Sequence, residues 1–376
     1  MKRLTLLYIG FVMCFATACT RQDFVEEGIE IPIDGYIYFN TDVASRGTLV
    51  TSLEESEFGV YAYNYVKDGK TYWNSVKAMA KPNVFYQKQI KWDEAGYHHD
   101  YDNKKAWAAD SLYTFFGYYP YDSNYIEHES NDHEGDPYLT YNLPTDGDVT
   151  KMVDVMTASL YDTDNSQSNQ VGLNFKHRLV AMDVQARNFN EPYNGEDVYV
   201  KVTSLTMKFN NMKHKGARLM MDASLKKDSL FLSDTTKWKP QYTLVGGLNS
   251  VSVPPSGAST GDGEATRLTG IDTNQNTTLM FLPQDGESID EDEKIYLNGW
   301  ITFTYQFVKK DGTSLTIKVG NENISTVTQT LPFTTGKNMV AGRKYNFQMT
   351  FSRTIITIAV IESGEWTDKD VDIEFS

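Results

Sequence analysis

The chain has 376 residues, a formal net charge of −15 and 2 cysteines. Its acidity argues against nucleic acid as a partner, because a phosphate backbone repels a negatively charged surface. Two cysteines exclude a disulfide-rich scaffold, so stability must come from core packing. The 24 Tyr and 19 Phe favour β-strands, whose pleated surfaces suit aromatic side chains.

The start of the chain has the pattern of an export signal. Two basic residues precede an apolar run over residues 4–15, and three small residues separate that run from Cys19. The run is shorter than the about 20 apolar residues of a membrane-spanning helix. The pattern predicts a lipoprotein signal peptide over residues 1–18 with a lipid on Cys19. The alternative is an ordinary signal peptidase site beside an incidental cysteine.

The next segment has the content of a β-strand. Residues 29–42 are rich in isoleucine, tyrosine and phenylalanine, and Ile29, Ile31 and Ile33 share one parity. Pro32 has no backbone N–H, so it would confine such a strand to the edge of a sheet.

One strand in the middle of the chain changes parity. Apolar side chains in residues 198–209 occupy even positions up to Val202 and odd positions from Leu205. A β-bulge near Thr203–Ser204 would return both sets to one face of a sheet.

Later segments alternate regularly. Residues 301–307 alternate apolar and polar side chains, a turn with Gly312 follows, and residues 315–319 alternate again, which predicts a β-hairpin. Residues 345–351 alternate in the same way. The run 355–361 is apolar on both parities, which predicts a strand buried on both faces.

Length and linkers suggest two domains. A domain commonly holds about 150 residues, and residues 162–170 form a polar stretch without apolar periodicity. The strand spacing is typical of antiparallel β-sandwiches. We therefore expect one sandwich over residues 47–172 and a second over residues 173–376.

The sequence contains no pattern typical of a catalytic or metal site. His98, His99, His128 and His133 lack the spacing of a metal centre, and the acidic run 285–293 reads better as a solvated loop than as a calcium loop. No nucleophile elbow or phosphate-binding loop is present. We expect no enzyme activity, cofactor or metal.

Several short segments occur in an order that is typical of one family. They are Phe58–Ala62, Tyr113–Pro120, Val153–Ala158, Leu173–Leu179, Phe281–Gln284, Ala341–Tyr345 and a late Trp366. On these segments the chain resembles the fimbrillin family, the subunits and accessory lipoproteins of type V pili on Gram-negative bacteria. The resemblance implies two tandem transthyretin-like β-sandwich domains.

The resemblance also implies a mechanism of assembly. Family members are exported as lipoproteins, and a protease cuts after an arginine near the N-terminus. That cut releases the first strand, and a strand from a neighbouring pilin subunit fills the groove. In this sequence the matching bond joins Arg46 and Gly47. Its cleavage would remove residues 19–46 together with the lipid, whereas an uncut chain would stay anchored in the outer membrane. The alternative for Arg46 is a solvated loop residue.

The end of the chain offers a donor strand. Val371, Ile373 and Phe375 alternate with acidic residues, so they form either a donor strand or an ordinary last strand. The short tail after Trp366 favours a tip, anchor or accessory role over a stalk role. We expect an adhesive fimbrial component at the cell surface, with a host or glycan receptor. The alternatives are a glycan-binding lipoprotein of a nutrient-uptake system and a secreted hydrolase.

Overall fold

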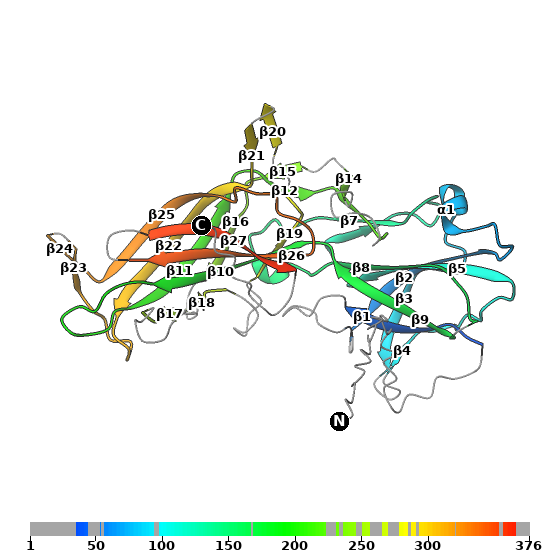
Figure 1. Ribbon diagram of the computed structural model, residues 1–376, viewed down its shortest axis with the longest axis horizontal. Helices are drawn as coiled ribbons and strands as arrows, with labels where there is room; N and C mark the ends of the chain where they lie inside the picture. The colour runs from blue at the N-terminus through cyan, green and yellow to red at the C-terminus, as the bar shows by residue number, and fades with distance from the viewer. Residues whose placement is uncertain are drawn as a thin grey trace, which may run out of the picture.

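Almost every element of the protein is a β-strand, which confirms the expected all-β class. The computed structural model describes residues 35–43, 53, 56–93, 98–166, 168–222, 231–232, 236–245, 250–255, 265–269, 278–284, 287–290, 293–319, 321–352 and 356–365. Helical turns in this part of the chain are α1 (Trp73–Val76), η1 (Lys77–Met79) and η2 (Val149–Lys151). The molecule is elongated, with the early strands at one end and the late strands at the other (Figure 1).

The early strands close into a ring. In spatial order they are β1 (Tyr38–Val43), β4 (His98–Asp100), β3 (Phe85–Asp93), β2 (Phe58–Val66), β5 (Ser111–Tyr119), β8 (Met156–Thr163) and β9 (Gln170–His177). Their neighbours pair antiparallel except β1 and β9, which run parallel. The antiparallel expectation did not include this parallel pair.

Strand β5 is buried on both faces because it separates two cores. Tyr113 and Phe115 point into the ring, whereas Phe116 and Tyr118 point out of it into a larger cluster. We call the first cluster the barrel core. Its members are Ile37, Phe39, Leu53, Phe58, Val60, Ala62, Phe85, Ile90, Tyr101, Tyr113, Phe115, Met156, Ala158, Val171, Leu173 and Phe175.

The late strands form two facing sheets. One sheet has the order β18 (Thr266–Arg267), β10 (Val180–Asn188), β26 (Arg343–Phe351) and β27 (Ile356–Glu365), with β19 (Leu279–Phe281) also on β10. The other has the order β16 (Gln241–Val245), β11 (Tyr199–Phe209), β22 (Asn298–Val308) and β25 (Thr326–Thr334), with β17 (Val251–Val253) on β11. Ring contacts such as Phe333 with Phe347, whose centroids are 5.0 Å apart, join the sheets.

Short strands connect the two ends of the molecule. Strand β7 (Tyr138–Tyr141) pairs with β6 (Ile126–His128) and with β13 (Ala217–Met220), which also pairs with β14 (Phe231–Leu232). The remaining strand pairs are β12 (Met212–Lys215) with β15 (Thr236–Trp238), β20 (Glu287–Asp290) with β21 (Glu293–Ile295), and β23 (Ile317–Val319) with β24 (Glu322–Ile324). Since β7 and β13 come from opposite halves, their pairing ties the halves together.

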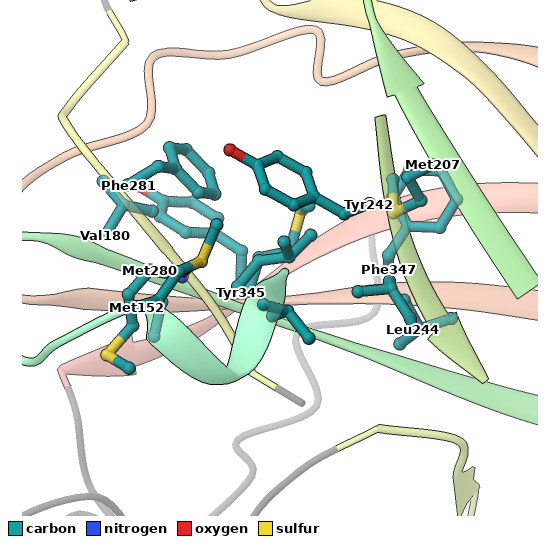
Figure 2. Close-up of a cluster of buried hydrophobic side chains, with 14 of the residues drawn as sticks. Met152, Val180, Met207, Tyr242, Leu244, Met280, Phe281, Tyr345 and Phe347 are labelled. Carbon is teal, nitrogen blue, oxygen red and sulfur yellow. Dashed lines mark hydrogen bonds between the residues drawn. The ribbon is translucent and has the colours of Figure 1, made fainter. Parts of the chain in front are cut away.

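The larger cluster, which we call the main core, continues from one half into the other. Figure 2 shows Met152, which follows η2, beside Met280 and Phe281 of β19. The backbone N–H of Met280 lies 3.1 Å from the Met152 sulfur. Tyr345 and Phe347 of β26 extend the same cluster, so the two halves share apolar burial.

The expected β-bulge is confirmed. The pairing of β11 with β22 shifts register between Val202 and Ser204. On both sides of the shift the apolar side chains are buried, as Val202 and Leu205 show at 0% exposure. The extra residue therefore keeps both parities on the core face, as the change of parity predicts.

The hairpin prediction for residues 301–319 is confirmed only at its turn. Val308 and Ser314 form an antiparallel bridge, and the Leu315 N–H donates to the Phe307 carbonyl at 2.8 Å. Away from the turn, β22 pairs with β25, and Ile317–Val319 pairs with β24. The prediction that the run 355–361 is buried on both faces is wrong over residues 356–360, because Thr357 and Ala359 are exposed whereas Ile358 is half-buried.

The change from the ring to the second half follows β9. Strand β9 spans the predicted boundary at residue 172 and stays in the ring to His177, and β10 begins at Val180. Arg178 and Leu179 form the link between them.

Candidate functional site

The first strand is part of the ring. Strand β1 pairs with β9 over six residue pairs, from Tyr38 with Gln170 to Val43 with Phe175. On its other side Phe39 pairs with His99 of β4. The described part of the predicted first strand therefore has strand neighbours on both sides.

A second segment holds the residues just before β1. The N–H of Ile37 donates to the carbonyl of Lys105 at 2.9 Å, and the N–H of Trp107 donates to the carbonyl of Gly35 at 3.0 Å. The Tyr101 hydroxyl donates to the Ile37 carbonyl at 3.0 Å. These bonds fix the start of β1 before its pairing with β9 begins.

Phe39 places β1 in the centre of the barrel core. Its side chain is 1% exposed. Its ring centroid lies 5.9–6.2 Å from the ring centroids of four neighbours, which are Phe58, Phe85, Tyr101 and Phe115. Burying a phenylalanine side chain stabilises a fold by about 1.5–3 kcal/mol, and edge contacts between rings add to that. Phe39 is thus the main apolar anchor of β1.

Strand β9 depends on β1 for most of its backbone pairing. Its pairs with β8 are limited to Met156 with His177 and Thr157 with Lys176. From Gln170 to Phe175 its described pairing is with β1. Without β1, that part of β9 would lose its strand neighbour while its alternate side chains stayed in the barrel core.

A glycine of β5 allows close packing against the inward side chains of β9. A Cβ atom on Gly117 of β5 would lie 2.8 Å from the Phe175 ring and 3.0 Å from a methyl group of Leu173. Glycine here allows β5 and β9 to pack across the ring at close range. We call the surface formed by β4, β5, β9 and Lys105–Trp107 around β1 the first-strand seat.

The link after β9 contains a buried polar junction. His177 Nδ1 lies 2.9 Å from a carboxylate oxygen of Asp154, and both side chains are buried. Arg178 donates through Nη2 to the carbonyls of Met220 and Asp222. Burial lowers the pKa of the Arg178 guanidinium to about 10. The histidine of the Leu173–Leu179 segment therefore has a structural partner at the junction.

Two other histidines also have partners near them. His99 Nε2 lies 3.1 Å from the Leu53 carbonyl, and His128 Nδ1 lies 3.2 Å from the Tyr61 hydroxyl. In the part of the chain that the structure describes, no three His, Cys, Asp or Glu side chains gather as a metal site. Over the same residues, no helix has the length and apolar character needed to cross a membrane.

The predicted site residues themselves lie outside the described part. They are Cys19, Arg46, Gly47, Val371, Ile373 and Phe375. Residues 29–34 of the predicted strand also lie outside it, and β1 begins at Tyr38. The seat was not predicted from the sequence, although the alternation of Val171, Leu173 and Phe175 could have identified β9 as one of its walls.

The chain resembles a known protein family and known structures. The model of the Fimbrillin-like family matches residues 46–366. A fimbrial protein from Bacteroides vulgatus is 23% identical and superposes with a TM-score of 0.63, over 88% of this chain and 99% of that one. A putative cell adhesion protein from Bacteroides uniformis is 14% identical with a TM-score of 0.46, over 90% of this chain and 100% of that one. No curated protein matches. Since the family model covers most of its length, the chain belongs to the fimbrillin-like family.

Proposed function

We propose that this protein is a structural and adhesive component of a type V pilus, in a tip, anchor or accessory position. In this proposal a lipid on Cys19 carries it to the outer membrane, and other pilin subunits are its partners. Its role is non-enzymatic. Membership of the fimbrillin-like family supports a surface location, and the first-strand seat supports assembly by exchange of β1.

The observation that carries the proposal is the dependence of β9 on β1. Loss of β1 would leave the backbone of β9 unpaired from Gln170 to Phe175. Each buried polar group left without a partner costs about 1–3 kcal/mol. The vacated position of Phe39 would also expose the rings around it. A strand from another subunit would remove both penalties, which is the physical basis of strand addition to a sheet.

Cleavage after Arg46 would create that vacancy. Strand β1 ends at Val43, so a cut between Arg46 and Gly47 would remove the whole strand together with Cys19. The same event would free the body of the protein from the membrane. One cut would thus couple release to opening of the seat.

The proposed donor is the C-terminal segment of a neighbouring subunit. Val371, Ile373 and Phe375 share one parity, as Ile37 and Phe39 do. Both Ile37 and Phe39 are buried in the barrel core. A donor with apolar side chains at alternate positions would fit the same inward positions, because side chains alternate between the faces of a strand.

An Arg-specific protease tests the proposal. Purified unlipidated precursor is digested, the new N-terminus is sequenced, and assembly is followed on gels and by size-exclusion chromatography. We expect a single new terminus at Gly47 and a ladder of oligomers. The variant Arg46→Ala should stay uncut and monomeric. A variant that lacks residues 371–376 should be cut but should not assemble.

Two results would contradict the proposal. Digestion at many sites without a terminus at Gly47 would exclude Arg46 as a controlled site. Clean cutting at Gly47 followed by a stable monomer that retains β1 would exclude strand exchange.

The alternative function, glycan binding for nutrient uptake, would be favoured by a row of exposed aromatic side chains. The exposed aromatic residues of the described chain are Tyr36, Tyr72, Tyr86, Phe189 and Trp300. Each belongs to a different segment of the chain. This distribution favours the pilus component over a dedicated glycan-uptake protein.

A further inference from the structure

One exposed aromatic side chain, Trp300, lies in a hollow on the outer face of the second half. The hollow lies on the sheet of β16, β11, β22 and β25, on the opposite face from the main core. Its lining residues are Thr206, Lys208, Gln241, Trp300, Thr302 and Thr330. Figure 1 shows these strands side by side in the half of the molecule that the late strands form.

The lining residues form two rows across neighbouring strands. Lys208 pairs with Gln241 on one side and with Trp300 on the other. Thr302 pairs with Thr206 and with Thr330. Residues directly opposite one another in a sheet point to the same face, so the rows place their side chains in one patch.

The backbone beneath the hollow is closely packed. A Cβ atom on Gly299 would lie 2.0 Å from the Lys208 carbonyl oxygen, so only glycine allows β11 and β22 to approach this closely. The Thr302 and Thr330 hydroxyls lie 2.9 Å apart. The patch is therefore a preformed surface on paired strands and does not depend on a loop.

The chemistry of the patch matches a sugar ring. Trp300 is 44% exposed, although Gly299 and Ile301 on either side of it are buried. A pyranose has a face of C–H groups and a rim of hydroxyls, so it can lie flat on an indole while neighbouring side chains bind its rim. The threonine hydroxyls and the Gln241 amide supply donors and acceptors for that rim.

Lys208 adds a charge preference. It is exposed, and no ion pair joins it to any residue that the structure describes. The lining contains no carboxylate, although the chain carries a net charge of −15. Lys208 is the charged side chain of this lining, so the lining favours a ligand that carries a compensating negative charge.

We propose that this hollow binds an acidic sugar, a pyranose that carries an ionised carboxylate. The Trp300 indole stacks on the sugar ring, Lys208 pairs with the carboxylate, and the threonine and glutamine side chains bind the hydroxyls. The proposal assigns a receptor class to an adhesive protein, and it does not depend on cleavage at Arg46 or on strand exchange.

Calorimetric titration of the full-length protein tests the site. The probes are 3′-sialyllactose, a disaccharide that ends in glucuronic acid, and neutral lactose. We expect an acidic probe to bind more tightly than lactose, and comparison of the two acidic probes identifies the acid. Trp300→Thr, which keeps a strand-forming residue, should weaken binding about tenfold or more, equivalent to about 1.4 kcal/mol. Lys208→Gln should reduce the affinity for the acidic probe to that for lactose.

Matched controls separate the site from general effects on folding. Phe189→Ala removes an exposed aromatic ring outside the hollow, and Lys318→Gln removes an exposed lysine outside it. Both should bind as the unmodified protein does, and circular dichroism should show the same fold for all variants. Failure of both acidic probes to bind at millimolar concentration would overturn the proposal. Equal binding by the unmodified protein and Trp300→Thr would also overturn it, as would self-association that Trp300→Thr abolishes.

Discussion

Replacement of Phe39 by alanine should loosen the first-strand seat more than any other part of the molecule. The ring is 1% exposed and has four aromatic neighbours within 6.2 Å. Loss of a buried phenylalanine side chain combines its transfer free energy with the cost of the cavity, about 3–5 kcal/mol in total. The barrel core is separate from the main core, so the effect should stay on the side of β1 and β9.

Two measurements check this expectation. Denaturant unfolding gives the loss in free energy of unfolding, and hydrogen exchange shows which strands lose protection of their amides. In Phe39→Ala, amides of residues 170–175 should exchange much faster, whereas those of β22 should change little. Val66→Ala is the control, because that side chain is 56% exposed and its loss should cost less than about 0.5 kcal/mol. A loss in free energy of unfolding below about 1.5 kcal/mol would refute the reasoning. Amide exchange that becomes equally faster in β22 and in residues 170–175 would also refute it.

Three further changes test other parts of the structure. Gly117→Ala should destabilise the protein by about 1–3 kcal/mol in thermal or denaturant unfolding, because the new methyl group would clash with Phe175. An unchanged unfolding midpoint would contradict the close contact between Gly117 and Phe175. Asp183→Asn removes the carboxylate whose oxygen lies 2.9 Å from the buried Lys344 ammonium. The expected loss is about 3–5 kcal/mol near neutral pH, and a loss within error would show that the pair is not formed. Burial raises the pKa of Glu129 from its ordinary value of 4.5 to about 8, so the protein should lose stability as pH rises from about 5 to about 8. Denaturation of Glu129→Gln at pH 5, 7 and 9 should show a gain over the unmodified protein that grows with pH, and a constant difference would exclude this residue as the cause.

The sequence predicted individual strands better than their partners. The bulge between Val202 and Ser204 follows from a change of parity within one strand, so local alternation was sufficient to find it. The pairing of β1 with β9 joins residues more than a hundred positions apart, and alternation identifies a buried face but not the strand beside it. The run 355–361 was predicted to be buried on both faces, yet Thr357 and Ala359 of β27 are exposed, because apolar residues on both parities do not reveal whether another layer covers each face.

The candidate site was only partly predictable. The sequence singled out Cys19, Arg46 and the alternating C-terminal residues, all of which lie outside the described part of the chain. It gave no sign of the Lys105–Trp107 segment that holds the start of β1, because those contacts are made through backbone groups. The Trp300 hollow also depends on register across four strands, which a single sequence does not reveal.

The parallel pairing of β1 with β9 has a mechanical consequence. The hydrogen bonds of such a pair are evenly spaced along both strands. A strand in this position that is pulled along its own axis would be loaded in shear. Its hydrogen bonds to the neighbouring strand would then share the force instead of breaking one after another from one end. A fibre whose joints were built in this register would resist tension far better than one whose joints could be peeled apart from an end.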